Sequence, residues 1–343
     1  MLSKAVLTAI HQQPLSKPDG LSIADVTVPW PAQVHPRAQA YFEASRARAS
    51  SYGLIGTGLM DVDVRRLMSF VILDTHVYAT ASYERLLVAG WFNQWLFFLD
   101  DLYDERPEMG RDTQRVYELM YRQIDVLCAG AQPDPNNPLE CFSSDLGYAL
   151  RNITSQVRWD AFVEGVEDYL FRGSLRSMIF WRKRVVPPPD QYVEIRTQDS
   201  AVMACFNLFQ VAVGIDLPDA VVRSPKVLEL SRYAILHISF LNDLVSYDKE
   251  VTRSGYPFNL LHVLMVHEGI DLAEAANRVI QQLNLYITQF VRLEGELAGT
   301  IAKYPDLGRY LGVIKSWVAG NLAFSLQSER YRHPESPFVE LRS

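Results

Sequence analysis

The hydrophobic positions of this chain fall in long runs with a helical period. Apolar stretches of roughly 20 to 30 residues are far longer than strands of roughly 4 to 8 residues. Short proline- or glycine-containing segments separate them at residues 133–138, 187–189, 216–225 and 254–257. No Asn-Gly or Asp-Gly pair joins two alternating segments, so a sheet has little support. The pattern predicts one all-α domain of ten or more helices.

Several of the predicted helices are apolar over most of their circumference, including residues 86–99 and 201–215. Both runs are shorter than the ~20 residues of a membrane span, and Asn93, Gln94, Asn207 and Gln210 interrupt them. In a water-soluble protein such helices lie inside a large bundle or line its cavity. We therefore expect a helical bundle around a central apolar cavity.

The first 36 residues differ from the remainder of the chain. Five prolines between Pro14 and Pro36 forbid one long helix there. We expect residues 1–36 to form an extended strap, anchored on the surface by Val28 and Trp30, and residues 37–343 to form a single helical domain.

The composition excludes several classes of protein. The balance of 33 basic against 40 acidic residues gives a net charge of −7, which argues against a general nucleic-acid or anionic-membrane binder. Cys128, Cys141 and Cys205 have no C-x-x-C spacing, so they indicate neither a zinc nor a redox site and fit a reducing compartment. The apolar run at residues 5–10 is shorter than the core of a secretory signal. We expect a cytoplasmic protein without stable membrane anchoring.

An acidic cluster at residues 100–105 follows the apolar run 91–99. On a helix Asp100 and Asp104 lie one turn apart on the same face, where their like charges repel beside a hydrophobic surface. A hard divalent cation with oxygen ligands would offset that cost. The alternative is a solvated acidic helix end before Pro107, and the cluster alone does not decide between the two.

A second polar cluster at residues 242–250 follows the apolar run 233–241. Asn242, Ser246 and Glu250 are spaced four and four, so they form one stripe of oxygen ligands along a helix. Lys249 lies nearly on the same face. These oxygens suit Mg²⁺, and the ammonium suits a phosphate oxygen. An ordinary helix end with a surface Lys-Glu pair would not explain a polar residue in every slot of the stripe.

Two further segments carry weaker signals. Arg196 and Asp199 can touch across one helical turn, so the guanidinium could hold a diphosphate while Asp199 orients it. Alone, such a pair is more often a local salt bridge. Arg330 and Tyr331 follow the apolar segment 318–326, and a lone Arg-Tyr pair indicates almost nothing by itself.

Together these four segments resemble the bacterial class I terpene synthase family over residues 28 to 333. Residues 100–104 resemble its aspartate-rich metal motif, and residues 242–250 resemble its second metal motif. Arg196 lies 46 residues before Asn242, where that family has a pyrophosphate-sensing arginine, and Arg330-Tyr331 lies where it has a diphosphate-binding pair. Asp199 and Ser200 match its linker and effector positions. The chain departs from the family at Phe324, often a tryptophan, and at Ser200, often a glycine.

The resemblance implies the class I terpenoid synthase fold and a trinuclear Mg²⁺ site that binds the diphosphate of a linear isoprenoid. Asp100, Asp104, Asn242, Ser246 and Glu250 would be the metal ligands, with Asp101 behind them. The diphosphate would contact Arg196, Lys249, Arg330 and Tyr331. Loss of the diphosphate leaves a carbocation, which Phe97 and Phe324 would face with their rings.

The sequence leaves the substrate and some alternatives open. Farnesyl diphosphate is favoured over geranylgeranyl diphosphate, and a homodimer stays open. A chain-elongating prenyl transferase normally has two aspartate-rich motifs, and this chain has one. A non-catalytic isoprenoid or lipid carrier would have no reason to keep both polar clusters. We also expect Asp100, Asp101 and Arg330 to lie apart until metal and diphosphate draw them together.

Overall fold

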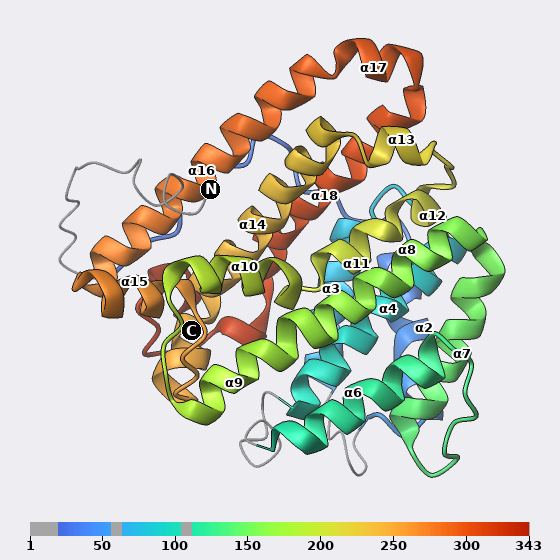
Figure 1. Cartoon of the computed structure of the whole chain (residues 1–343), viewed down its shortest axis with the longest axis horizontal. Coiled ribbons are helices and arrows are strands. Elements are labelled where there is room, and N and C mark those ends of the chain that lie inside the picture. Colours follow the sequence, from blue (N-terminus) through green and yellow to red (C-terminus); the bar gives the residue numbers. More distant parts are fainter. Residues whose placement is uncertain (1–19, 56–63, 104–111, 343) are drawn as a thin grey trace.

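The computed structural model describes residues 20–55, 64–103 and 112–342 of the chain. Within these residues the protein is helical, and its extended contacts are limited to isolated bridges such as that between Leu21 and Phe338. The prediction of an all-α fold is confirmed. Helices α3 and α4 pack on each other, and α18 lies between α3 and α14 (Figure 1).

The first half of the described chain contains seven α-helices and one π-helical segment. Their bounds are α2 Ala38–Ser51, α3 Val64–Val77, α4 Tyr83–Tyr103, α6 Thr113–Leu127, α7 Pro138–Ile153, α8 Gln156–Glu167, the π-helical segment η1 Asp168–Ser174, and α9 Leu175–Lys183.

The second half contains the remaining helices. Their bounds are α10 Pro189–Asp199, α11 Val202–Asn207, α12 Phe209–Val213, α13 Asp219–Val222, α14 Pro225–Tyr247, the π-helical segment η2 Asp248–Arg253, α15 Leu260–Glu268, α16 Leu272–Glu296, α17 Ala298–Lys303, α18 Pro305–Gln327, and the short 3₁₀ helices η3 Glu329–Tyr331 and η4 Val339–Leu341.

Local sequence signals explain where many helices begin. The Asn137 side chain caps α7, which has Pro138 in its first turn, and the Asn259 side chain caps α15. Proline also opens α10, α14 and α18. The predicted break at residues 254–257 falls between helices, and the breaks at 133–138 and 187–189 end at the prolines that open α7 and α10. The break at 216–225 holds the short helix α13.

The expected helical run at residues 201–215 is broken twice. Ala201 has a positive φ of 57°, which ends the backbone path of α10 and starts α11 at a new angle. Leu208 then separates α11 from α12. A left-handed alanine costs roughly 1–2 kcal/mol, so packing around the cavity has to support it.

The described part of the N-terminal strap is held by the C-terminal segment and by α16. Leu21 exchanges backbone hydrogen bonds of 2.9 Å with Pro337 and Val339. Trp30 packs edge-on against Phe290 at 5.1 Å between ring centroids, and Val28 also packs on the core, as expected. Residues 1–19 lie outside the described residues, so the boundary at residue 36 stays a prediction.

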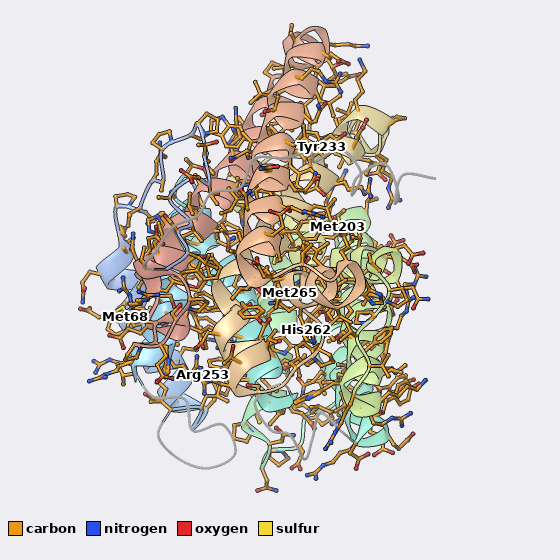
Figure 2. All side chains as sticks on the ribbon, turned by 90° about the vertical axis from the view of Figure 1, so that its left-hand side faces the viewer. Met68, Met203, Tyr233, Arg253, His262 and Met265 are labelled. Atoms are coloured by element: carbon orange, nitrogen blue, oxygen red, sulfur yellow. The ribbon has the colours of Figure 1, made fainter. Side chains whose placement is uncertain are left out.

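Side chains fill the space between the helices (Figure 2). Trp95 of α4 is fully buried and donates a hydrogen bond of 2.8 Å to Ser143 of α7. Met265 of α15, labelled in Figure 2, accepts a hydrogen bond from Tyr247 at the end of α14. In the part of the chain that is described, no helix combines the length and hydropathy that a bilayer crossing needs.

Candidate active site

A cavity of about 190 Å³ lies between α4, α10, α14 and α18. Its wall gathers residues that are up to 258 positions apart in the chain, from Leu73 to Tyr331. The residues predicted from the sequence that line it are Phe97, Asp100, Arg196, Asp199, Ser200, Asn242, Lys249, Glu250, Phe324, Arg330 and Tyr331. Asp101 and Ser246 are buried behind this wall, and Asp104 lies outside the described residues.

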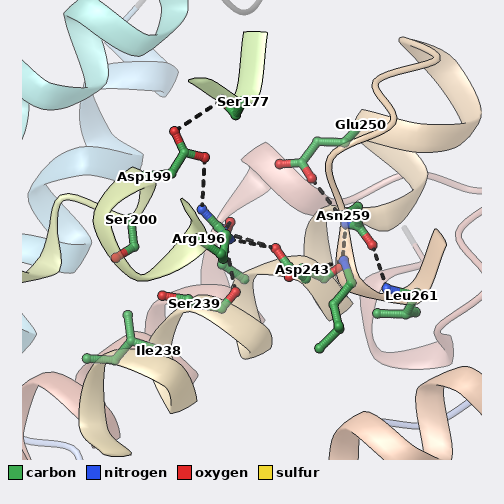
Figure 3. Close-up of polar contacts among 12 residues, drawn as sticks. Ser177, Arg196, Asp199, Ser200, Ile238, Ser239, Asp243, Glu250, Asn259 and Leu261 are labelled. Carbon is green, nitrogen blue, oxygen red and sulfur yellow. Dashed lines mark hydrogen bonds and ion pairs between the residues drawn. The ribbon is translucent and has the colours of Figure 1, made fainter. Parts of the chain in front are cut away.

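Arg196 is the centre of a buried polar network (Figure 3). Its guanidinium donates to Asp243 at 3.0 Å and to the side-chain oxygen of Asn242 at 2.8 Å, and it lies 3.7 Å from Asp199. Arg196 is therefore held by residues of α10 and α14 together. The pairing anticipated between Arg196 and Asp199 is present, but Asp243 is the stronger partner.

Asp243 is a site residue that the sequence reasoning missed. It is fully buried and accepts hydrogen bonds from Tyr192, from Arg196 and from the backbone N–H of Leu260. Burial raises the pKa of this carboxyl, and Arg196 and Tyr192 oppose that rise. In the sequence, Asp243 could have been identified only by its position directly after Asn242, next to the predicted stripe of ligands. That offset turns it away from the cavity and toward α10.

Asp199 is positioned by the helix on its other side. Ser177 of α9 donates to it at 3.3 Å, and Tyr256 donates to Ser177 at 3.0 Å. Burial raises the pKa of the Asp199 carboxyl to about 6, although Arg196 lowers it. Gly173 in η1 allows this approach, because a Cβ there would lie 2.4 Å from the Asp199 backbone nitrogen.

The second polar cluster does not continue as one α-helix. Helix α14 ends at Tyr247, and Glu250 lies in the π-helical segment η2. Lys249 and Glu250 of this wider turn line the cavity, while Ser246 in the last turn of α14 is buried behind the wall. Of the predicted stripe, Asn242 and Glu250 line the cavity and Ser246 does not, and the stripe does not follow one regular α-helix. Their role as metal ligands stays a prediction.

Burial also shifts the pKa values of the charged residues in η2. Burial and the charge of Asp243 raise the pKa of Glu250 to about 7, while Asn259 donates to its carboxyl at 3.1 Å. Burial and the charge of Arg330 lower the pKa of Lys249 to about 8. These two groups are expensive to keep charged in this site, so charged ligands of opposite sign would relieve both.

Arg330 closes the other side of the cavity. It lies 2.9 Å from Asp101 and 3.2 Å from Asp100, and its charge lies 5.4 Å from the Phe97 ring centroid. Arg66 adds a second cation 3.4 Å from Asp101. The expectation that Asp100, Asp101 and Arg330 lie apart is wrong for this structure. A nearly fully buried guanidinium requires compensating charge, and the two carboxylates supply it.

Tyr331 joins the C-terminal pair to the second polar cluster. Its hydroxyl oxygen accepts a hydrogen bond of 2.9 Å from the Asn242 amide nitrogen, and its ring packs on Phe324 at 5.8 Å. Burial raises the pKa of Tyr331 to about 12, so its hydroxyl keeps its proton. It can therefore donate to an anionic ligand.

The aromatic residues separate into cavity and core. Phe97 and Phe324 line the cavity with centroids 6.3 Å apart, and Trp317 also lines it. Phe70 is fully buried and stacks on the outer side of Phe97 at 4.3 Å. Phe206 is buried against Phe209. The core interpretation of Phe70 and Phe206 agrees with this arrangement.

The donor set fits a divalent cation in one specific respect. The Ser246 hydroxyl oxygen is buried and has no hydrogen-bond partner among the described residues. Burial and the charge of Asp243 raise the pKa of the Glu250 carboxyl, so a cation bound beside it would favour its charged form. Asn242 now offers its oxygen to Arg196, so this oxygen would have to change partner before it could ligate a metal. No group of three His, Cys, Asp or Glu residues forms a compact cluster within the described ranges.

Comparison with known proteins shows which family the chain belongs to. The profile of the family described as "Terpene synthase family 2, C-terminal metal binding" matches residues 92–289, more than half of the chain. The chain belongs to this family. It is therefore an enzyme of the terpene synthase class, a carbon–oxygen lyase that acts in isoprenoid biosynthesis, and the family description supports the use of a divalent metal.

Individual proteins show the same similarity. The chain is 29% identical over 321 residues to a (+)-T-muurolol synthase of Roseiflexus castenholzii, covering 90% of this chain and 93% of that protein. It is 27% identical over 271 residues to a germacrene A synthase of Nostoc punctiforme, covering 78% and 82%. The crystal structure of germacradien-4-ol synthase from Streptomyces citricolor has the same fold. Its TM-score is 0.75 at 19% identity, with 89% of this chain and 99% of that chain covered.

Proposed function

We propose that this enzyme ionises a linear isoprenoid diphosphate in a Mg²⁺-dependent reaction and cyclises the resulting carbocation, with release of diphosphate. Farnesyl diphosphate is the favoured substrate, and geranylgeranyl diphosphate is the alternative. The supporting observation is the lining of one cavity. Cationic side chains and side-chain oxygens line its rim, and aromatic and aliphatic side chains line the remainder of its wall. We also propose a cytoplasmic location.

The metal would be held by Asn242, Ser246 and Glu250 on one side of the cavity and by Asp100 on the other. The family resemblance adds Asp104 as a further ligand and implies three ions. Divalent cations supply charge that stabilises a departing diphosphate. Every other part of the ionisation step is carried by the chain itself.

Four side chains contribute positive charge or a proton donor at the rim. Arg196 and Arg330 would hold the diphosphate oxygens in place, and the Lys249 ammonium and Tyr331 hydroxyl would complete the contact. Asp199 orients Arg196, and the backbone carbonyl of Ser200, the residue before the break at Ala201, is the proposed effector group. When the carbon–oxygen bond breaks, its electron pair leaves with the diphosphate.

The apolar half of the cavity would then protect the cation. The aliphatic and aromatic lining excludes water, and the rings of Phe97 and Phe324 offer their faces to positive charge. No protein nucleophile is required, because carbon–carbon bonds form between parts of one substrate.

The proposal is tested by incubating purified protein with Mg²⁺ and separate C10, C15 or C20 diphosphates. A cyclic hydrocarbon or alcohol detected by mass spectrometry, together with released diphosphate, is the expected result. Chelation with EDTA should abolish it, and Mg²⁺ should restore it. Turnover of similar rate in metal-free buffer, or a longer linear diphosphate as the product, would contradict the proposal.

A further inference from the structure

Apart from Asn242 at the rim, two amide side chains line the cavity, Asn321 of α18 and Asn93 of α4. Asn93 lies farther from the rim than Phe97 on its helix. Helix α4 lines the cavity with Asn93, Leu96, Phe97 and Asp100, which share one face of the helix. Asn93 lies two turns before Asp100, or about 10 Å along the helix axis. The diphosphate would lie at the Asp100 end, so Asn93 faces the far part of the hydrocarbon.

Trp317 of α18 also indicates that Asn93 lies at the end of the cavity far from Asp100. It lies seven residues before Phe324 on α18 and also lines the cavity. Its ring packs edge-on against Tyr78 at 6.1 Å, and Tyr78 lies close to Asp74 and Cys205. Two helices thus extend from the polar rim to the same deep end.

Asp74 of α3 holds the Asn93 side chain from behind the cavity wall. Asp74 is fully buried and does not line the cavity. It accepts hydrogen bonds from the Asn93 amide at 2.9 Å, from the Tyr41 hydroxyl at 2.7 Å and from the Gln94 amide at 3.1 Å. An ionised carboxylate only accepts, so the NH₂ group of Asn93 has to face Asp74.

The amide oxygen of Asn93 is thereby turned the other way. It accepts a hydrogen bond of 3.4 Å from the thiol of Cys205, another residue of the cavity wall. A thiol is a weak donor, and an amide oxygen has two lone pairs. The oxygen therefore keeps capacity to interact with positive charge in the cavity.

We propose that Asn93 is a substrate-contacting residue whose amide oxygen stabilises positive charge on the far part of the isoprenoid, and that Asp74 is the positioning residue that holds this oxygen toward the cavity. This inference rests on the proposed function. The interaction is between a charge and a dipole, and no covalent bond or proton changes place in it. It would favour those cyclisation branches in which charge develops at the far end of the chain.

The test compares the products of Asn93→Leu with those of the unmodified enzyme. Leucine has nearly the same shape and removes the dipole. We expect the ratio of far-end-charged products to early-quenched products, per diphosphate released, to fall about tenfold. Assays are run at least one pH unit above the pKa of the Asp74 carboxyl, which burial raises to about 7, so that most of this carboxyl is ionised. If leucine prevents folding, Asn93→Ala leaves room for a water molecule to pair with Asp74.

Tyr41→Phe is the matched control. It removes the hydroxyl that donates a hydrogen bond to Asp74, and Tyr41 does not line the cavity. The control should lower the unfolding temperature and leave the product ratio unchanged. If Tyr41→Phe changes the products as much as Asn93→Leu does, the effect belongs to the fold and the inference is overturned.

Asp74→Asn tests the positioning role. An asparagine can donate as well as accept, so it no longer dictates which way the Asn93 amide points. The variant should shift the product ratio in the direction of Asn93→Leu, and should add nothing when Asn93 is already leucine. Equal effects in both backgrounds would overturn the positioning role. No turnover by the unmodified enzyme would contradict the proposed function instead, and unchanged products in a fully active Asn93→Leu variant would overturn this inference alone.

Discussion

The Phe97 and Phe324 rings come from two helices and meet across the cavity at 6.3 Å. Because both rings lie beyond the groups that would hold the diphosphate, they should act on the cation after the leaving group has departed. Replacing either with leucine keeps apolar bulk and removes a cation–π contact of about 1–2 kcal/mol. We expect a 5–30-fold redistribution between competing products, roughly the factor that this energy implies, with metal dependence unchanged.

Mass spectrometry of the product mixture checks this prediction. Acyclic or monocyclic hydrocarbons should be enriched in Phe97→Leu and Phe324→Leu. Phe206→Leu is a suitable control, since Phe206 is buried but does not line the cavity. Wild-type product ratios in both test variants would show that these rings serve only as core.

Asp74 predicts a pH dependence of stability. Burial raises the pKa of its carboxyl from 3.8 to about 7, although Tyr41, Gln94 and Asn93 donate to it. Between these values the folded protein keeps a proton that the unfolded chain has released. The free energy of unfolding should therefore decrease as pH rises through this window, by up to about 1.4 kcal/mol per pH unit from this group.

Denaturant unfolding at several pH values measures the effect. Asp74→Asn removes this titration, so its unfolding free energy should vary less between pH 3.8 and about 7 than that of the unmodified protein. Glu250 and Asp199 contribute in the same direction and remain in both proteins, so they cancel in the comparison. Parallel pH profiles for the two proteins would contradict the assignment to Asp74.

At the scale of elements, the site depends on how closely η1 approaches the end of α10. A Cβ at Gly173 would lie 2.4 Å from the nitrogen and 2.5 Å from the Cα of Asp199. Gly173→Ala should push the end of α10 away, at about 1–3 kcal/mol of stability. A displacement near 1 Å of Arg196 and Asp199 can reduce turnover about 100-fold.

Gly312→Ala in α18 is the matched control, because no heavy atom lies within 4 Å of a Cβ built there. This variant should retain activity and gain up to about 1 kcal/mol of stability from helix propensity. Steady-state kinetics and thermal unfolding distinguish the two variants. Full activity in Gly173→Ala would mean that α10 adjusts without moving the site.

At the scale of the whole molecule, metal and diphosphate should bind the folded chain and stabilise it together. The rim draws on α4, α10, α14, η2 and η3, so ligands that bridge it connect segments far apart in sequence. Ligand at 100 times its dissociation constant should add about 2.7 kcal/mol to the free energy of unfolding. Thermal unfolding with Mg²⁺ and diphosphate, each alone and combined, measures this.

Asn242→Leu and Glu250→Ala should lose most of the stabilisation by the combined ligands while keeping a helical circular dichroism spectrum. Both residues line the cavity, and their loss removes ligand oxygens more than core contacts. Either variant unfolding without ligand would show that the residue supports the helix itself. An equal ligand-induced shift in variant and unmodified protein would place the metal elsewhere.

Local signals in the sequence were enough to predict the all-α class, several of the breaks between helices and most of the residues that line the cavity rim. These properties depend on local signals: helical periodicity, proline and asparagine caps, and polar residues spaced at three and four along apolar helices. Asn242 and Glu250 could be identified as candidate site residues because they are polar residues at helical spacing that follow an apolar run. Arg196 and Arg330 were less distinctive alone, and only the combination of segments made them candidates.

The hydrogen-bond and ion-pair partners of the site residues depend on the tertiary structure. Asp243 became a hub because helices α10 and α15 pack against α14 and present Tyr192, Arg196 and the Leu260 N–H to it. Asp74 and Asn93 meet because α3 and α4 pack side by side, 19 residues apart in the chain. The π-helical turn of η2 and the left-handed Ala201 redirect side chains in ways that no local period predicts. The spacing of polar residues along the sequence identifies the unusual positions. Which charges these residues compensate depends on how deeply they are buried and on which helices pack against them, and both depend on the folded chain.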